Sequence, residues 1–385
     1  MRRSGLLLWL SVALASAAAR QNAPSSLSPA QVSIQRAEAA IAKAPQNARA
    51  YNELAMALAR RARETSDVMF YSRADEALEK SLRLTPDSCD ALKVRAWILL
   101  GKHEFAKALE VAQNLQKRNP DDVVVYGYLV DANAELGIYK DAEQAAQWML
   151  DLRPGNVPGL TRAAYLRELF GDVDGALELM SMVFDSTAPS ETEDRAWLLT
   201  QMAHLHLLEG RVNEAERLLT RALHVFPQYH YALANLAKVR LLQHRYSEAV
   251  ELLRQRFANA PHAENLFDLA EALKLAGQTT KAKQAFALFE IKSLAESERA
   301  DNSNRELIFY YADHAHRPGD ALRIAKREFA RRHDVYTIDS YAWALYANRS
   351  YAKARQQIEA ALEIGIRDPK LLEHSRRIIK ATATP

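Results

Sequence analysis

The sequence predicts an all-α protein, a solenoid of stacked helical hairpins, and three observations support this class. An alanine recurs along the chain at intervals close to 34 residues, the flanking segments have helical apolar periodicity, and residues that break helices are scarce. The 385 residues include only 12 glycines and 13 prolines, which is few for a protein rich in β-turns. Hydrophobic residues make up 49% of the chain, so a largely disordered protein is excluded.

The recurring alanine is the main signal. Its nine occurrences are separated by 33, 34 or 39 residues, and they are Ala74, Ala108, Ala142, Ala176, Ala215, Ala249, Ala282, Ala321 and Ala354. A proline follows many of them by twelve residues, at Pro86, Pro120, Pro154, Pro227 and Pro261, and another small residue often precedes them by twelve. We therefore expect one structural unit per interval.

Each unit contains two amphipathic helical patterns, which the fifth unit shows clearly. Apolar residues follow an i, i+3, i+4, i+7 spacing in 197–208 and again in 213–225, with a turn at 209–211 and a stop at Pro227. Such a hairpin cannot bury its apolar face alone, whereas stacked hairpins can. The length therefore predicts one continuous solenoid and not two or three globular domains.

This pattern resembles the tetratricopeptide repeat, a 34-residue helix–turn–helix unit. The best matches are Leu92, Ala96, Leu99, Ala108 and Pro120; Tyr126, Gly137, Ile138, Tyr139, Ala142 and Pro154; and Leu199, Ala203, His206, Gly210, Ala215, Ala222 and Pro227. The resemblance covers roughly residues 28–380 and implies a right-handed α-solenoid. We expect a capping helix in 28–46, about nine units in 47–368 that start near 48, 89, 123, 157, 196, 230, 263, 302 and 335, and a capping helix with a tail in 369–385.

Three departures from the repeat are visible. The first unit has about seven extra residues around 62–69, and the fourth and seventh units each run five residues long. Units seven to nine lack the closing proline at its usual place.

The N-terminus predicts export. Arg2 and Arg3 precede an apolar run over 5–19 that contains A-x-A triplets, which is typical of a cleavable signal peptide over 1–19, followed by a linker over 20–27. An uncleaved signal anchor is the alternative. The run is shorter than the ~20 residues of a spanning helix, and no later stretch is apolar enough, so we expect no stable membrane insertion after cleavage and a periplasmic or secreted protein.

Charge and motif content argue against several functions. The chain has 51 Lys and Arg against 48 Asp and Glu, so nothing indicates a nucleic-acid partner. The single cysteine, Cys89, excludes an intrachain disulfide and a multi-cysteine metal site. His204 and His206 point about 200° apart on a helix and cannot chelate one ion together. We find no catalytic, phosphate-binding or dinucleotide motif, and expect neither enzymatic activity, nor a cofactor, nor a bound metal.

The resemblance implies that the first helix of each unit lines a concave groove. The groove candidates for partner binding are Asn52, Lys93, Trp97, Asp131, Tyr165, Trp197, Thr200, His204, Lys238, Phe267, Glu271, Asp339 and Trp343. This mixture of aromatic and charged side chains is typical of a peptide-binding surface. The leading hypothesis is therefore a scaffold or adaptor that binds a peptide or helix of a partner protein, in the cell envelope.

Three alternatives remain open at this point. Trp97, Trp197 and Trp343 could pack between adjacent units instead of facing the groove. If they are exposed together with Tyr165, they could stack on a glycan or another small ligand. The segment 293–304 could instead mediate self-association. The sequence names neither the partner nor the oligomeric state.

Overall fold

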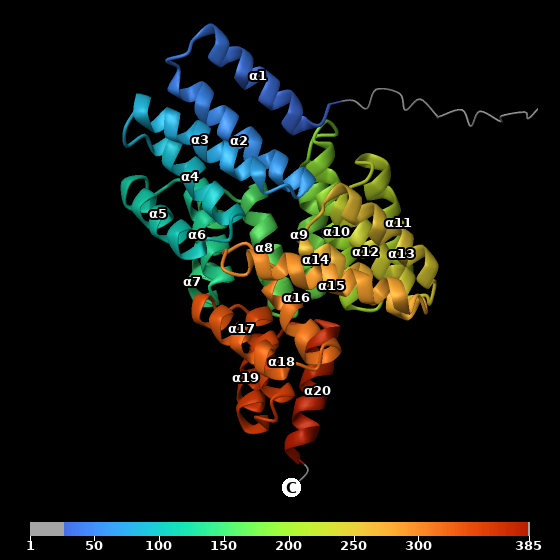
Figure 1. The fold of residues 1–385 in the computed structure, drawn as a ribbon. Coiled ribbons are helices and arrows are strands. Elements are labelled where there is room, and N and C mark those ends of the chain that lie inside the picture. Colours follow the sequence, from blue (N-terminus) through green and yellow to red (C-terminus); the bar gives the residue numbers. More distant parts are fainter. Residues whose placement is uncertain (1–26, 384–385) are drawn as a thin grey trace, which may run out of the picture.

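All regular secondary structure is helical in residues 27–383, the part of the chain that the computed structural model describes (Figure 1). The predicted fold class, a right-handed α-solenoid of helical hairpins, is confirmed. The expected signal peptide and nearly all of the expected linker lie outside the described residues.

A single helix, α1 (Pro29–Lys43), precedes nine hairpins, and α20 (Pro369–Ala383) follows them. The hairpins are α2 (Ala48–Thr65) with α3 (Met69–Leu84), α4 (Cys89–Gly101) with α5 (Phe105–Arg118), α6 (Val123–Glu135) with α7 (Tyr139–Leu152), α8 (Val157–Leu169) with α9 (Val173–Ser186), α10 (Thr192–Leu208) with α11 (Val212–Val225), α12 (His230–Leu242) with α13 (Tyr246–Asn259), α14 (Ala263–Leu275) with α15 (Thr279–Glu296), α16 (Asn304–Phe309) and its π-helical continuation η1 (Tyr310–His314) with α17 (Pro318–Arg331), and α18 (Val335–Ala347) with α19 (Tyr351–Ile364).

The recurring alanines lie in the second helix of each hairpin, and every one of them is at most 3% exposed. The small residues twelve positions earlier, for example Ala96 and Ala203, lie in the first helices and are fully buried. A methyl group at both places allows the two helices of a hairpin to approach closely, while larger apolar side chains fill the space between hairpins.

Local signals define the ends of the helices. Ser28 begins α1 with a capping box, because its hydroxyl accepts from the amide of Gln31 while the Gln31 side chain accepts from the amide of Ser28. The side chains of Asn47 and Asp122 cap α2 and α6 in a related way. Where a closing proline is present, the second helix ends two residues before it, as α5 does ahead of Pro120.

The first helices form the inner side of the superhelix. Neighbouring first helices contact one another directly, as α2 does with α4, α6 with α8, and α16 with α18. We call the surface that these helices present to the superhelix axis the inner wall. Figure 1 shows the chain curving from α1–α7 through α8–α13 and returning through α14–α16 to α17–α20.

One full turn of this superhelix takes about 196 residues. The carbonyl of Ser66 accepts from His262, and the hydroxyl of Tyr139 accepts from the amide of Val335 at 2.8 Å, each pair 196 residues apart. Successive turns therefore touch, and the solenoid closes against itself along two lines of contact, which we call the upper and the lower seam.

Candidate functional site

The upper seam joins the end of α2 to the starts of α10, α12 and α14. Arg60 binds Glu191 at 2.6 Å and Asp194 at 3.1 Å. Arg63 binds Asp194 at 2.5 Å and also pairs with Glu193. These ion pairs link residues that are 130 to 134 positions apart, so they fix the first hairpin against the fifth.

The centre of the upper seam is buried. The Glu193 side chain has no exposed surface and also accepts from the hydroxyl of Tyr229 at 2.8 Å. Burial raises the pKa of Glu193, and Arg63 opposes that rise. His230 is 2% exposed, and its Nε2 lies 3.1 Å from the carbonyl of Arg63; burial lowers the pKa of His230 to about 4. This histidine is therefore neutral at pH 7 and donates to that carbonyl.

The lower seam joins the third and fourth hairpins to the ninth. A Cβ at Gly137 would lie 2.3 Å from the carbonyl oxygen of His333, and one at Gly171 would lie 2.5 Å from that of Gly365. Both glycines have positive φ angles, of 79° and 82°. The amide of His333 donates to the carbonyl of Leu136 at 3.4 Å. Only a residue without a side chain allows this approach of backbone to backbone.

Apolar packing continues across the lower seam. One buried cluster contains residues of the second to fourth hairpins, such as Leu166, together with residues of the last three, such as Ile308 and Ile358. Hairpins five and six, which lie between them in sequence, contribute buried residues to other clusters. The shared cluster therefore connects the two turns directly through space.

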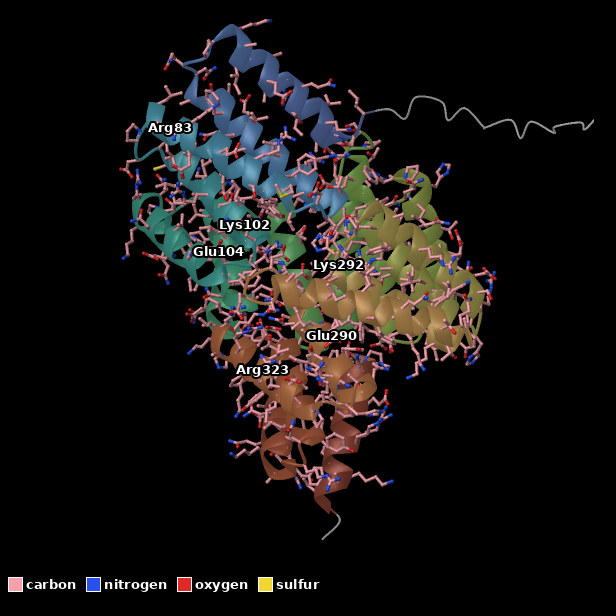
Figure 2. All side chains as sticks on the ribbon, viewed as in Figure 1. Arg83, Lys102, Glu104, Glu290, Lys292 and Arg323 are labelled. Carbon is pink, nitrogen blue, oxygen red and sulfur yellow. The ribbon has the colours of Figure 1, made fainter. Side chains whose placement is uncertain are left out.

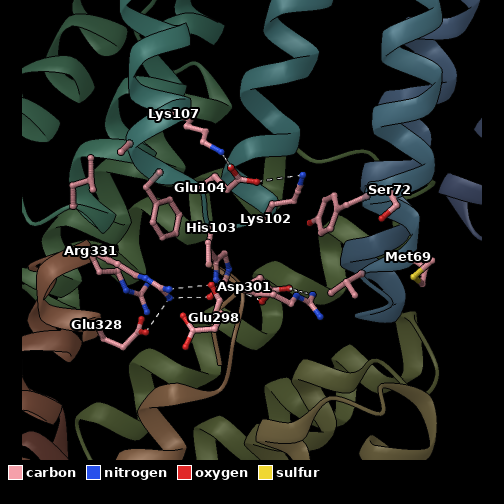
Figure 3. Close-up of a pocket in the computed structure, with 18 residues that line it drawn as sticks. Met69, Ser72, Lys102, His103, Glu104, Lys107, Glu298, Asp301, Glu328 and Arg331 are labelled. Atoms are coloured by element: carbon pink, nitrogen blue, oxygen red, sulfur yellow. Dashed lines mark hydrogen bonds and ion pairs between the residues drawn. The ribbon is translucent and has the colours of Figure 1, made fainter. Parts of the chain in front are cut away.

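A cavity of about 750 Å³ lies between the two turns, bounded by the α3 start, the α4–α5 turn, the segment 298–301 and the end of α17 (Figure 3). Its charged groups mostly pair with one another. Lys102 binds Asp75 at 3.0 Å and Glu104 at 3.3 Å, while Arg331 donates to the carbonyls of Glu298 and Arg299, both at 3.0 Å. This cavity therefore offers few uncommitted groups to a ligand.

The outer surface shows no side chains of one sign gathered together. Figure 2 shows nitrogen-tipped and oxygen-tipped side chains interspersed over the visible face, as the near balance of charges leads one to expect. Glu290 on α15, for example, pairs with Arg317 at 2.7 Å. The inner wall is therefore the more informative surface.

Several predicted groove residues lie on the inner wall but bind other residues of the chain. Lys93 binds Asp122 at 2.6 Å, Asp131 binds Arg162 at 2.5 Å, His204 lies 3.1 Å from Glu168, and Glu271 lies 2.7 Å from His314. The hydroxyl of Tyr165 donates to Glu135 at 3.3 Å. These side chains cross-link successive first helices, so they stiffen the wall. Asn52 is half-buried, and its side-chain oxygen is buried with no bonding partner.

Other groove predictions are wrong because the side chains are buried. Thr200, Phe267, Asp339 and Trp343 are all 5% exposed or less. The hydroxyl of Thr200 donates to a carbonyl of its own helix. The carboxylate of Asp339 lies 2.9 Å from His374, whose ring stacks on Trp343.

Trp97 and Trp197 pack between hairpins, which was the alternative interpretation. Both are half-buried and lie against apolar clusters; the ring of Trp97 is 6.5 Å from that of Tyr128 in the next hairpin. The tryptophans therefore act mainly in packing.

Lys238 is the groove candidate that stays exposed and without a bonded partner. Two further basic residues share this condition and were missed from the sequence: Arg305 on α16 and Lys370 on α20. Arg305 lies in the eighth unit, where the repeat is least regular, and Lys370 lies on a helix expected to face solvent. Only the superhelical curvature brings them to the inner wall.

A second cavity, of about 690 Å³, opens at the C-terminal end of the inner wall. Its lining includes Glu271, Lys274, His314, Trp343 and Lys370. His314 lies in η1, the π-helical segment, and such segments occur frequently at functional sites. The part of the chain that the structure describes contains no group of three His, Cys, Asp or Glu side chains suited to a metal ion. Over residues 27–383, no helix is both long and apolar enough to cross a membrane.

Comparisons with known proteins agree with the fold. Family models described as tetratricopeptide repeat match residues 93–157 and 206–264. No curated protein matches the sequence. Among solved structures, a chain of the APC/C hetero-tetramer Cut9–Hcn1 is 13% identical with a TM-score of 0.54; the match covers 90% of this chain and 59% of that one.

The human IFIT1 dimer, solved with PPP-AAAA, is 11% identical with a TM-score of 0.53, and the match covers 88% of this chain and 91% of that one. At such low identities the likeness shows the fold alone.

Proposed function

The two family matches and the fold support a tetratricopeptide repeat protein, and on that premise we propose that it is a non-enzymatic scaffold whose inner wall binds a peptide or helix of a partner protein. Proteins built from this repeat generally mediate protein–protein interactions. The identity of the partner is not part of the proposal.

The observation that carries the proposal is an inner wall that is rigid and still offers uncommitted polar groups. Ion pairs between successive first helices, such as Lys93 with Asp122, hold the wall in place. The seams hold one turn of the superhelix against the next. Lys238 and Lys370 remain exposed and without a bonded partner on this frame. A preorganised surface of this kind reduces the ordering cost of binding.

The test is site-specific photo-crosslinking in the cells that make the protein. A crosslinker at Lys238 reports on the inner wall, and a matched crosslinker at Glu251, exposed on the second helix α13, serves as control. We expect the inner-wall position to capture a defined partner through one segment of its chain, and the control to capture it much less. Equal capture of the same proteins from both positions would contradict the proposal.

The structure weakens the alternative of a glycan-binding module. That function requires several aromatic rings exposed along one wall. Trp343 is 5% exposed, Trp97 and Trp197 pack between hairpins, and the hydroxyl of Tyr165 is bonded to Glu135. No row of free aromatic platforms is therefore present on the inner wall among the described residues.

Self-association through 293–304 also loses support. Residues up to Glu296 belong to α15, the hydroxyls of Ser293 and Ser303 bond each other at 2.8 Å, and Asn304 donates to Glu328 at 2.7 Å. The segment is occupied by contacts within the chain.

We propose further that the protein acts outside the cytosol, because residues 1–19 have the composition of a signal peptide. N-terminal sequencing of the protein from fractionated cells tests this. A mature chain that starts near residue 20 in the exported fraction is expected. An intact Met1 in the cytosolic fraction would contradict it.

A further inference from the structure

Three basic side chains on the inner wall have no acidic partner. They are Lys238 on α12, Arg305 on α16 and Lys370 on α20, and none forms a hydrogen bond or ion pair with any residue in 27–383. The Nε atom of Arg305 is buried with no acceptor. We call these three residues the cation cluster.

The cluster converges from three helices that are far apart in sequence. The guanidinium of Arg305 and the ammonium of Lys370 both lie over the ring of Phe309, at 5.9 Å and 3.6 Å from its centroid. Arg305 also lies 4.7 Å from the ring of Tyr336. Burial lowers the pKa values of Lys238 and Lys370, and repulsion from Arg305 contributes to both. All three cations therefore experience one another.

Most carboxylates near the cluster are already committed. Asp268 accepts from Arg256 at 2.5 Å, Asp339 from His374, Asp313 from the indole of Trp343 at 2.9 Å, and Asp368 from the amide that begins α20. Glu271 is bound to His314. Within the described residues, Glu306 is the remaining neighbour without a bonded partner, and burial raises its pKa. The cluster keeps a local excess of positive charge.

Charges held together without counter-charges destabilise a fold, so they are retained where a ligand supplies the opposite charge. We propose that the cation cluster is a binding site for an oxyanion ligand, a carboxylate or phosphate group carrying at least two negative charges. Arg305 gives a planar set of donors that suits either oxyanion, and the two lysines add point charges.

The 690 Å³ cavity gives such a ligand room. Lys370 lies on its wall, and the other lining residues with positive charge include Lys274 and Arg377. An acidic segment of a partner could therefore reach the cluster through this opening. The inference rests on the proposed function only in placing the ligand on the same inner wall.

Isothermal titration calorimetry on the whole mature chain tests the site with two probes, inorganic pyrophosphate and a tri-glutamate peptide, at low ionic strength. We expect saturable binding of at least one probe. Pyrophosphate alone would identify phosphate as the recognised group, and the peptide alone would identify carboxylates. Arg305→Gln and Lys370→Gln should each weaken that binding about tenfold, the size expected for one charge-assisted contact.

Two controls separate a site from general attraction between charges. Lys326→Gln removes an exposed cation on the second helix α17 and should leave affinity unchanged. Lys238→Met should raise the melting temperature of the ligand-free protein while weakening probe binding, because it removes an uncompensated charge; a purely structural lysine would lower the melting temperature. Absence of saturable binding, or equal losses with Lys326→Gln, would overturn the inference.

The two proposals fail separately. Probe binding at the cluster with no partner captured from Lys238 would contradict the scaffold role and leave the anion site standing. A captured partner whose binding neither probe competes with would contradict the anion site and leave the scaffold standing.

Discussion

The upper and lower seams close the same superhelix with different chemistry. The upper seam consists of long charged side chains, with Arg60 and Arg63 reaching three acidic residues at the start of α10. The lower seam consists of backbone pressed against backbone at Gly137 and Gly171, with a shared apolar cluster beside it. A gap between turns can thus be bridged by side chains or removed by leaving them out.

The upper seam uses the parts of the sequence that break the repeat. The first helix of most hairpins has 13 residues, but α2 has 18 and α10 has 17. The additional residues carry Arg61, Arg63 and Glu64 in one case and Glu193 and Asp194 in the other. The lower seam needs no insertion, because its glycines occupy the ordinary turn position of their hairpins. Irregularities in a repeat protein therefore deserve inspection as sources of long-range contact.

The largest effect is expected at the upper seam. Glu193→Ala leaves Arg63 without its buried partner and Tyr229 without its acceptor, and breaking a buried pair in this way costs about 3–5 kcal/mol. Urea unfolding followed by circular dichroism measures this loss. The matched control is Glu191→Gln at the solvent-exposed rim, which should cost less than about 1 kcal/mol. Similar losses for both variants would show that the seam has no buried centre.

The seams should respond to pH in opposite directions. The lowered pKa of His230 contributes stability that is complete above its unfolded value near 6.5 and is lost as pH falls toward 4, by up to about 3 kcal/mol. Burial raises the pKa of Glu135 to about 7, so its contribution is complete below about 4.5 and is lost as pH rises toward 7. This second effect is smaller, because the Glu135 side chain keeps 30% exposure.

Melting temperatures between pH 4 and pH 8 test this contrast. His230→Gln should flatten the acid side of the profile and Glu135→Gln the rise toward neutral pH. If both variants left the profile parallel to that of the wild-type protein, neither group would report on its seam.

At the lower seam, Gly137→Ala should cost about 2 kcal/mol. The added methyl group meets the His333 carbonyl, and alanine is disfavoured at a φ of 79°. Gly210→Ala is the control, because Gly210 has a φ of 68° with open space around it, so only the backbone penalty of about 1 kcal/mol applies. Equal losses would mean that the close contact contributes nothing.

Salt should produce the smallest difference. Raising sodium chloride to 0.5 M screens the exposed pairs of Arg60 and should weaken the upper seam by less than about 1 kcal/mol, while the lower seam is unaffected. Hydrogen exchange would then quicken at the end of α2 and not at the start of α18. The opposite pattern would reverse the assignment of chemistry to the two seams.

The sequence was sufficient for the local fold and insufficient for the site. The period of the alanines predicts helical hairpins because helix packing within a hairpin is a local matter, and the structure buries every one of those alanines. The seams depend on a small rotation between hairpins that accumulates over 196 residues, and no local pattern encodes that sum.

The same limit explains the individual errors. Asp122 neutralises Lys93 because of how one hairpin sits on the next, and His374 covers Trp343 from the terminal helix. Arg305 and Lys370 meet over Phe309 although 65 positions separate them in sequence. Periodicity assigns a residue to a face, but it does not say what the curvature places opposite that face.

The 196-residue turn has an evolutionary consequence. Tandem-repeat proteins usually gain or lose units by duplication and deletion, since each unit contacts only its neighbours. Here the end of α2 must arrive at α10, α12 and α14, and Gly137 must arrive at His333. Deleting or adding a single hairpin between them would displace every such encounter by about 34 residues, so this architecture can vary in its surface but is held to a fixed number of units.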